Sequence, residues 1–307
     1  MQGCAYVNGQ FVPPSEAKIS IFDWGFLHSD ATYDVAHVWQ GNFFRLGDHL
    51  DRFFNSMQTL RLNCGKTRDE VHDIMHECVR RSGLRDAYVE VLCTRGMPAP
   101  GSRDPRSATN QFMAFAIPFV WIANPEKQKA GINLIVTSYQ RIPPSSVDPT
   151  VKNYHWLDMV MALFQAYERG GETALLVDAA GNVAEGPGFN VFVVHNGEGG
   201  RKVVTTPNRG VLEGVSRRTM IDLCTRLGHD MRVEPLTVER LRQADEVFLS
   251  STGGGAIAVS HLDGQPIAGR PAGEFGPVAC QLQAAYCALH NRPPYSEPLI
   301  FREQSAR

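Results

Sequence analysis

The sequence predicts an α+β protein with a mixed N-terminal domain and a larger, barrel-like C-terminal domain. The chain has 307 residues, of which 43% are hydrophobic and 20% charged, which is enough to bury two cores. Beyond residue 131 many short segments resemble strands, and helical patterns interrupt them only at 151–169, about 214–227 and about 275–290. Strands in this partly hairpin-linked order favour an α+β fold over a regular βαβ array.

The N-terminal domain is predicted to cover residues 1–121. The segments "ATYDVAHVW" and "NFFRL" flank the turn signal Gln40-Gly41 and predict a hairpin. "DHLDRFFNSMQTL" places its apolar side chains on one helical face, and Thr67 followed by Glu70 predicts a capping box that opens a second helix. The strands "AYVEVLCT" and "NQFMAFAIPFVW" follow, separated by a loop rich in glycine, proline and arginine.

A polar stretch ending in glycine, "IANPEKQKAG", predicts an interdomain linker over 122–131. The C-terminal domain then covers 132–307. Its strands are predicted in "INLIVTSY", "TALLVD", "FNVFVV", "KVVTTP", "EVFLSS" and "AIAVSHL".

Charge and cysteine content narrow the class of protein. The net charge of -2 and the lack of long basic runs leave no electrostatic footprint for nucleic acid. No apolar run reaches the length needed to cross a bilayer, and "MQGCAYVNGQF" does not resemble a signal peptide. The seven cysteines are scattered and never spaced CxxC, which indicates reduced thiols. We therefore expect a cytoplasmic protein without nucleic-acid or membrane partners.

Two apparent motifs are rejected because the sequence around them does not match the motif. "GPGFNV" resembles a dinucleotide fingerprint but leads into a strand, whereas that fingerprint opens a helix. His72 and His76 are one helical turn apart in "HDIMH", yet the glutamate of a zinc protease is missing. We expect both histidines on a solvated face and no metal site.

Lys152 is the one lysine in "DPTVKNYHWLDMVMALFQAY", at the start of a predicted apolar helix. From Trp156 onward apolar residues recur at helical spacing. The preceding Asp148-Pro149-Thr150 predicts the helix start, with Thr150 as its cap. A lysine at a helix end is usually solvated, so position alone assigns it no role.

Two glycine-flanked stretches predict anion sites. "GVLEGVSRRTM" enters a helix near Val215 and Ser216, where free backbone N–H groups lie beside a hydroxyl. "FLSSTGGGAIAV" ends a strand with hydroxyls that include Thr252, followed by three glycines. Each alone is usually an ordinary loop. Together with a buried lysine, they suggest one phosphorylated cofactor.

Glu185 supplies a carboxylate on the core face of a predicted strand, where its burial is costly without a partner. A protonated pyridine nitrogen is such a partner. Lysine, carboxylate and phosphate cradle are the three protein parts that a pyridoxal 5'-phosphate site requires.

At this point the sequence resembles the fold-type IV, or class IV, pyridoxal-phosphate transaminases. The resemblance runs from "SIFDWGFLHSDATYDV" to "LSSTGGGAIAV", with "DHLDRF", "VKN", "AEGPGFNVF" and "GVLEGVSR" in the family's order. It implies that Lys152 attaches the cofactor covalently and then moves a proton. It also implies that Glu185 pairs with the ring nitrogen and that Arg52 binds phosphate. Val215, Ser216 and Thr252 would complete the phosphate cup. A homodimer is a further implication.

Departures from the family pattern bear on the substrate. Branched-chain members read like "YGDGVFEG" where this chain has "HSDATYDV", which places His28 and Tyr33 at pocket positions. They also carry an arginine at the position of Glu90, and on a strand Tyr88 shares the face of Glu90. These segments look most similar to the (R)-selective amine transaminases. The resemblance thus implies transfer of an amino group between an (R)-configured primary amine and a keto acid such as pyruvate.

Two further pocket residues are expected. Many members place "NY" several residues after the lysine, whereas here these residues follow Lys152 directly, so Trp156 is a pocket candidate. In the loop after "YVEV", Arg103 is the preferred contact for a keto-acid carboxylate, ahead of Arg95 and Arg106. A branched-chain or D-amino acid transaminase stays open as an alternative. An aminodeoxychorismate lyase and a catalytically silent binding protein are further alternatives.

Overall fold

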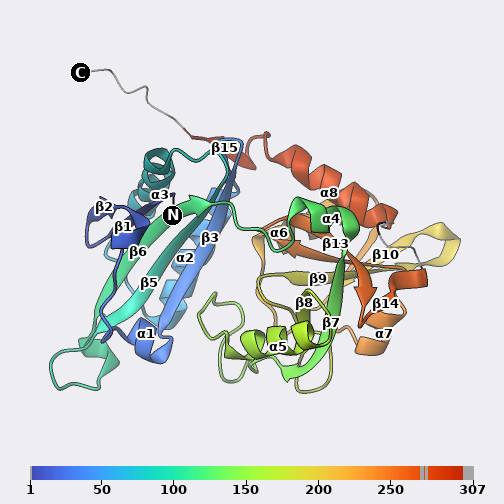
Figure 1. Ribbon diagram of the computed structural model, residues 1–307, viewed down its shortest axis with the longest axis horizontal. Helices are drawn as coiled ribbons and strands as arrows, with labels where there is room; N and C mark the ends of the chain where they lie inside the picture. The colour runs from blue at the N-terminus through green and yellow to red at the C-terminus, as the bar shows by residue number, and fades with distance from the viewer. Residues whose placement is uncertain (1, 270–272, 274–275, 300–307) are drawn as a thin grey trace. The chain divides into compact units, whose positions relative to one another are not determined.

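The computed structural model describes residues 2–269, 273 and 276–299, and the chain divides into two compact units. The first unit is drawn from three stretches, Met1–Val120, Val151–Tyr154 and Leu289–Arg307. The second is drawn from Trp121–Thr150 and His155–Ala288. Each unit is built around one large sheet (Figure 1).

The first unit contains a seven-stranded sheet in the order β15-β4-β3-β5-β6-β1-β2. Its strands are β1 (Cys4–Val7), β2 (Gln10–Val12), β3 (Ala31–Trp39), β4 (Asn42–Phe44), β5 (Ala87–Met97), β6 (Thr109–Pro118) and β15 (Ser296–Pro298). Every pairing in this sheet is antiparallel. The edge strand β15 therefore brings the C-terminal end of the described chain beside β4.

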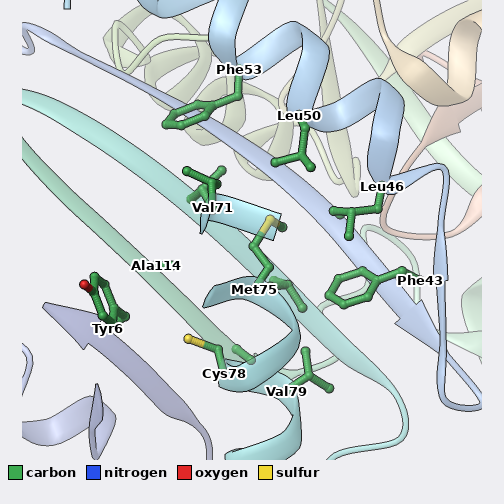
Figure 2. Packing of buried hydrophobic residues seen from close by; sticks show 14 of the residues in the cluster. Tyr6, Phe43, Leu46, Leu50, Phe53, Val71, Met75, Cys78, Val79 and Ala114 are labelled. Carbon is green, nitrogen blue, oxygen red and sulfur yellow. The ribbon is translucent and has the colours of Figure 1, made fainter. Parts of the chain in front are cut away.

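Three helices belong to the first unit: α1 (Trp24–His28), α2 (Leu46–Leu60) and α3 (Arg68–Ser82). Helices α2 and α3 bury one face each against the sheet, so that Leu50, Phe53, Val71 and Met75 lie in one apolar cluster with Phe43 (Figure 2). The predicted capping box at Thr67 is confirmed, with both reciprocal hydrogen bonds present.

The second unit contains an eight-stranded sheet in which seven strands follow the order β11-β10-β9-β12-β13-β7-β8, with β14 paired to β13. The strands are β7 (Ile132–Gln140), β8 (Thr173–Val177), β9 (Asn190–Asn196), β10 (Lys202–Thr206), β11 (Asp230–Val233), β12 (Glu246–Ser251), β13 (Gly255–Leu262) and β14 (Gln265–Pro266). Parallel and antiparallel pairings are mixed. The predicted α+β class is confirmed.

The helices of the second unit are α4 (Pro125–Ala130), α5 (Leu157–Glu168), α6 (Val215–Arg226), α7 (Val238–Arg242) and α8 (Pro277–Leu289). Two sequence expectations need correction here. Part of the stretch expected as a linker, 122–131, forms the short helix α4. Helix α5 begins at Leu157, not at 151, so Thr150 does not cap it. No helix among the described residues is long and apolar enough to span a membrane.

Candidate active site

Lys152 lies in an extended segment ahead of helix α5 and is fastened to strand β3 of the first unit. Its carbonyl oxygen accepts hydrogen bonds from the Thr32 hydroxyl at 2.7 Å and from the Tyr33 N–H at 3.2 Å. Asn153 forms an isolated β-bridge with Thr32. Because the main chain is bound to β3 directly after the lysine Cα, the half-buried Lys152 side chain starts from a fixed position.

The amine meets a group of tyrosines, which we call the tyrosine–carboxylate cluster: Tyr33, Tyr88, Glu90 and Tyr154. Lys152 Nζ lies 4.2 Å from the centre of the Tyr33 ring, which stacks on Tyr154 at 4.4 Å. The Tyr154 hydroxyl donates to one oxygen of Glu90 at 2.6 Å, and the Tyr88 hydroxyl donates to the other at 2.8 Å. One contiguous chain of contacts thus connects the amine with a buried carboxylate.

Glu90 is 7% exposed, and both of its oxygens have donors. Burial raises its pKa, while hydrogen bonds from Tyr154 and Tyr88 and the charge of Lys152 act in the opposite direction without overcoming it. The same burial, together with the Glu90 charge, raises the pKa of both tyrosines, so both remain hydroxyl donors. The bond from Tyr88 confirms that positions 88 and 90 share one face of β5.

Arg52 is held in a buried ion pair between α2 and β3. Its Nε and Nη2 donate to the two oxygens of Asp34 at 2.7 and 2.8 Å, and His49 Nδ1 lies 2.8 Å from Asp34. Burial alone would raise the pKa of Asp34, but Arg52 and His49 outweigh it and hold the pKa well below its usual range. The fork of Arg52 is therefore oriented by a fixed carboxylate, as a two-point phosphate contact requires.

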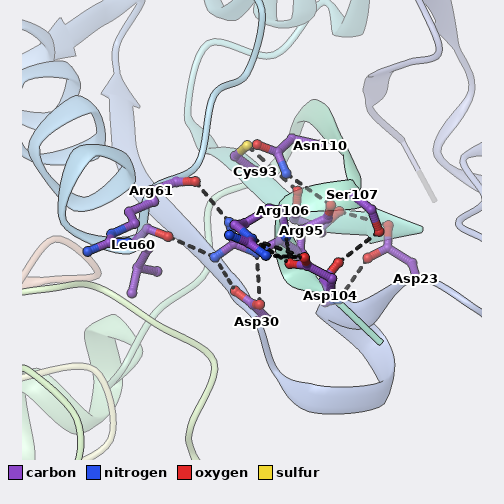
Figure 3. A network of polar contacts seen from close by, with 12 residues as sticks. Asp23, Asp30, Leu60, Arg61, Cys93, Arg95, Asp104, Arg106, Ser107 and Asn110 are labelled. Atoms are coloured by element: carbon purple, nitrogen blue, oxygen red, sulfur yellow. Dashed lines mark hydrogen bonds and ion pairs between the residues drawn. The ribbon is translucent and has the colours of Figure 1, made fainter. Parts of the chain in front are cut away.

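The three candidate arginines differ in their partners: Arg95 lies near the end of β5, Arg103 and Arg106 lie in the loop that follows, and Figure 3 shows the contacts of Arg95 and Arg106. Arg95 is fixed by both oxygens of Asp30 at 2.9 Å and by two main-chain carbonyls. Arg106 pairs with Asp104 at 2.6 Å. Within the described part of the chain, Arg103 has neither an ion pair nor a side-chain hydrogen bond, and it is exposed. Of the three, Arg103 alone has its guanidinium uncommitted.

Two expected pocket residues, His28 and Trp156, are described by their contacts within their own units. His28 ends the short helix α1, is exposed, and packs edge-on against Trp24 at 4.9 Å. Trp156 is the N-cap residue of α5 in the second unit and packs on the apolar cluster that contains Met159.

Glu185 lies in the second unit and is 4% exposed. Its oxygens contact Arg141 Nε at 3.1 Å and accept the Leu212 N–H at 2.8 Å, with the Asn190 amide at 3.4 Å. Arg141 also pairs with Asp158 at 2.8 Å. The Glu185 carboxylate is thus an acceptor held in place by N–H donors from the main chain and from side chains.

The predicted phosphate-binding residues lie at a helix start and at a strand end of the second unit. Helix α6 begins at Val215 behind Gly214, and a Cβ on that glycine would lie 2.4 Å from Asn190 Oδ1. Ser216 is buried, with its hydroxyl 3.1 Å from the Tyr286 hydroxyl. Thr252 lies in the turn between β12 and β13. The first-turn N–H groups of α6 form the kind of anion site that a phosphate occupies.

The residues present fit pyridoxal phosphate on their own chemistry. The structure supplies a half-buried lysine with its amine against an aromatic ring, a buried carboxylate, and a helix start preceded by glycine. A further observation points the same way: among the described residues the buried Ser250 hydroxyl has no hydrogen-bond partner. Buried hydroxyls without partners are uncommon, which is consistent with a polar group bound at the β12 end.

These features define a cofactor-dependent enzyme of the mixed α/β class, and its family follows from similarity to known proteins. Residues 31–262 match the family model described as amino-transferase class IV, so the chain belongs to this family. The fold is that of the fold-type IV aminotransferases, and the protein is a pyridoxal-phosphate-dependent aminotransferase.

Several known proteins are similar over nearly the whole chain. A Methanocaldococcus jannaschii protein named "Putative branched-chain-amino-acid aminotransferase" is 34% identical over 272 residues, 88% of this chain and 91% of the relative. The branched-chain-amino-acid aminotransferase of Escherichia coli K12 is 25% identical over 291 residues, 92% of each chain. A solved T.th. branched-chain amino acid aminotransferase with pyridoxamine 5'-phosphate superposes with a TM-score of 0.88 at 30% identity, covering 97% and 99% of the two chains.

Sequence reasoning missed three residues that the structure places at these positions. Tyr154 stacks on Tyr33, the ring that Lys152 Nζ faces, and its spacing of two residues from Lys152 in an extended segment was the available signal. Asp34 orients Arg52, and Arg141 pairs with Glu185. Neither Asp34 nor Arg141 has a local signal, because their partners lie 18 and 44 residues away.

Proposed function

We propose that Lys152 attaches the cofactor through its amine and that Glu185 contacts the ring nitrogen. Arg52, the α6 start at Val215 and Ser216, and Thr252 would bind the phosphate. The support is chemical: each residue offers the donor, acceptor or nucleophile that its role needs, held in place by the contacts described above.

When bound, pyridoxal phosphate supplies an electron sink for the bonds of the amino-bearing carbon. The protein residues then have separate tasks. The Lys152 amine takes up and returns the proton at that carbon, because it is the basic nitrogen whose backbone is fixed beside the cluster. The Glu185 carboxylate would accept a hydrogen bond from the ring nitrogen, and Arg141 holds that carboxylate in position.

For the substrate, we propose an (R)-configured primary amine without an α-carboxylate as amino donor, with a keto acid such as pyruvate as acceptor. The observation that carries this is Glu90, a buried carboxylate whose two oxygens are fixed by Tyr88 and Tyr154 within the cluster that also contacts Lys152. A substrate carboxylate near Glu90 is repelled by the like charge. For partly buried charges this repulsion weakens binding by on the order of a few kcal/mol. The (R) configuration is inferred from the resemblance to the (R)-selective enzymes.

A second candidate is a branched-chain amino acid aminotransferase. It is favoured by the comparisons, since the relatives and solved structures named above carry that description. In this case the substrate carboxylate needs a cationic partner elsewhere in the site, because position 90 offers none.

One set of rates separates the two candidates. We would measure kcat/KM for (R)-1-phenylethylamine, its (S) enantiomer and L-leucine in the wild type and in Glu90→Gln, with pyruvate as acceptor for the amines. The wild type should prefer the (R)-amine to L-leucine. Glu90→Gln should lower the ratio of kcat/KM for the (R)-amine to kcat/KM for L-leucine by about 100-fold, which corresponds to about 3 kcal/mol of lost repulsion.

The matched control is Glu77→Gln, which removes a carboxylate on α3 that is paired only with surface arginines in the described structure. It should leave all three rates unchanged. Efficient turnover of L-leucine by the wild type, with little activity on the (R)-amine, would establish the branched-chain candidate instead.

A further inference from the structure

Three side chains of types that bind metals converge in the first unit, and none of them has a role assigned above. His72 and His76 are one turn apart on α3, and Glu297 lies on the edge strand β15. One oxygen of Glu297, Oε1, lies 2.8 Å from His72 Nε2 and 2.7 Å from His76 Nε2. The three ligand atoms lie within 4.8 Å of one another.

The fold holds each of these groups in place. His72 and His76 flank the buried face of α3, and the His76 ring packs against the buried Phe43 with 4.8 Å between ring centres. Strand β15 pairs with β4 so that Glu297 is directly opposite Phe43. The histidine pair and the carboxylate are therefore positioned by the same core phenylalanine.

The second nitrogen of His72 strengthens this assignment. His72 Nδ1 lies 3.3 Å from a carboxylate oxygen of Asp73, while His72 Nε2 faces Glu297. A histidine whose outer N–H is bound by a carboxylate is also the usual arrangement at metal sites.

We propose that His72, His76 and Glu297 bind one divalent transition-metal ion of the Zn²⁺ type, with water as the remaining ligand. Two imidazoles and one carboxylate form a donor set that Zn²⁺ accepts in tetrahedral geometry. Bonds of about 2.0–2.2 Å need ligand atoms roughly 3.5 Å apart, which small side-chain adjustments supply from the separations above. This corrects the expectation that both histidines lie on a solvated face: they are half-buried, with side chains 33% and 21% exposed.

The ion would act as a clamp and not as a reactant. It would join β15, the last strand of the described chain, to a helix more than two hundred residues earlier, since Glu297 and His76 are separated by 221 positions. Metal binding would stabilise the native state because the unfolded chain does not hold these three ligands together. Transamination itself does not need the ion.

The test uses the cofactor-loaded enzyme after chelation and removal of free cofactor. Calorimetric titration with ZnCl2 should show one ion per chain with a Kd of about 10 μM or tighter. Saturating Zn²⁺ should raise the thermal unfolding midpoint. X-ray absorption at the zinc edge should show only nitrogen and oxygen ligands.

Two variants and one control complete the experiment. His76→Gln with Glu297→Gln should abolish the tight site and the thermal shift, while transaminase activity in chelator stays at the wild-type level. His229→Gln, which alters a surface histidine bonded to Gln281, should bind like the wild type.

The proposal is wrong if no binding appears below about 1 mM, or if the double variant still binds one ion tightly. Sulfur ligands in the absorption spectrum would assign the ion to an exposed thiol such as Cys280 and would equally overturn it. If the double variant does not fold, the spectrum of the wild type and the single His72→Gln variant decide the question.

Discussion

Lys152 has a firmly positioned main chain in the first unit. Its carbonyl is bound twice by β3 and its Nζ lies over a tyrosine ring. Because the main chain of Lys152 is already fixed, its side chain loses less conformational freedom when it attaches a ligand. This favours a covalent role for Lys152 over that of an ordinary solvated lysine.

Replacing Lys152 by alanine should abolish turnover and the adduct that borohydride reduces. The reason is that no other amine would take over both attachment and proton transfer. Mass spectrometry of the reduced, digested enzyme identifies the modified lysine. Lys202→Ala, on strand β10, is the control and should keep both adduct and activity. A reducible adduct at a different lysine in Lys152→Ala would refute the assignment.

Arg103 differs from its neighbours in having no partner among the described residues, so its guanidinium can move to a ligand. We expect Arg103→Ala to weaken use of pyruvate by about 10- to 100-fold, as loss of a charged hydrogen bond implies, and amine use much less. Separate half-reaction rates measure the two sides. Arg106→Ala serves as the control. Equal losses on the amine and keto-acid sides would exclude the contact.

Between elements, the contact that matters most near the cluster is the Asp34–Arg52 pair, which joins β3 to α2. Asp34 is 1% exposed and bonded by both Arg52 and His49. Removing one member of a buried pair leaves the other charge uncompensated, which costs about 3–5 kcal/mol.

This pair predicts a pH dependence of stability. The folded-state pKa of Asp34 is held below its unfolded value of about 3.9, so its stabilisation is complete above that pH and is lost as pH falls through the folded-state pKa. Urea unfolding of the wild type and Asp34→Asn should show a large difference in unfolding free energy at pH 7. The difference should shrink below about pH 4. A difference that stays constant down to pH 3 would contradict the ion-pair account.

Elements were predictable from sequence where their signals are local. The hairpin at Gln40-Gly41 and the capping box of Thr67 and Glu70 involve neighbours in the chain, and both are confirmed. The predicted start of α5 was wrong, because the segment around Lys152 is extended and pairs with β3, 120 residues away in the sequence. Tertiary pairing of this kind overrides a helical pattern, and nothing in the local sequence reveals it.

The same limit applies to the candidate sites. The residue types for the cofactor were readable because each carries a chemical role in a recognisable motif. The partners that orient these residues could not be predicted, since neither Asp34 nor Arg141 lies in a sequence motif that indicates its role. The approach of Glu297 to two histidines required a strand pairing between the two ends of the first unit.

At the scale of the whole molecule, the first unit leaves a run of apolar side chains in contact with solvent. Five residues between β2 and the end of α1 are 47–68% exposed: Ile19, Ile21, Phe22, Phe26 and Leu27. Apolar residues gathered in this way are typical of a surface that another chain covers. The homodimer implied by family resemblance therefore remains a prediction, with this segment as its proposed contact.

Light scattering at micromolar concentration tests the prediction. The wild type should have the mass of two 34.0 kDa chains, and Phe22→Asp with Phe26→Asp should shift it to one chain, because charges in an apolar interface are left unpaired. Val233→Asp, at another exposed apolar position, should remain dimeric. A fully active wild type of monomeric mass would show that the segment has another use.

Strand β15 also has a consequence for how the protein is made. The ribosome releases β4, which ends at Phe44, about 250 residues before β15 at Ser296–Pro298. At roughly 5–20 residues per second, the nascent chain carries an unfinished sheet edge for tens of seconds, and such an edge is a template for mispairing. The sheet of the first unit is thus completed only once β15 has been made, so the yield of the protein in cells should depend on chaperones that shield β4 until β15 emerges.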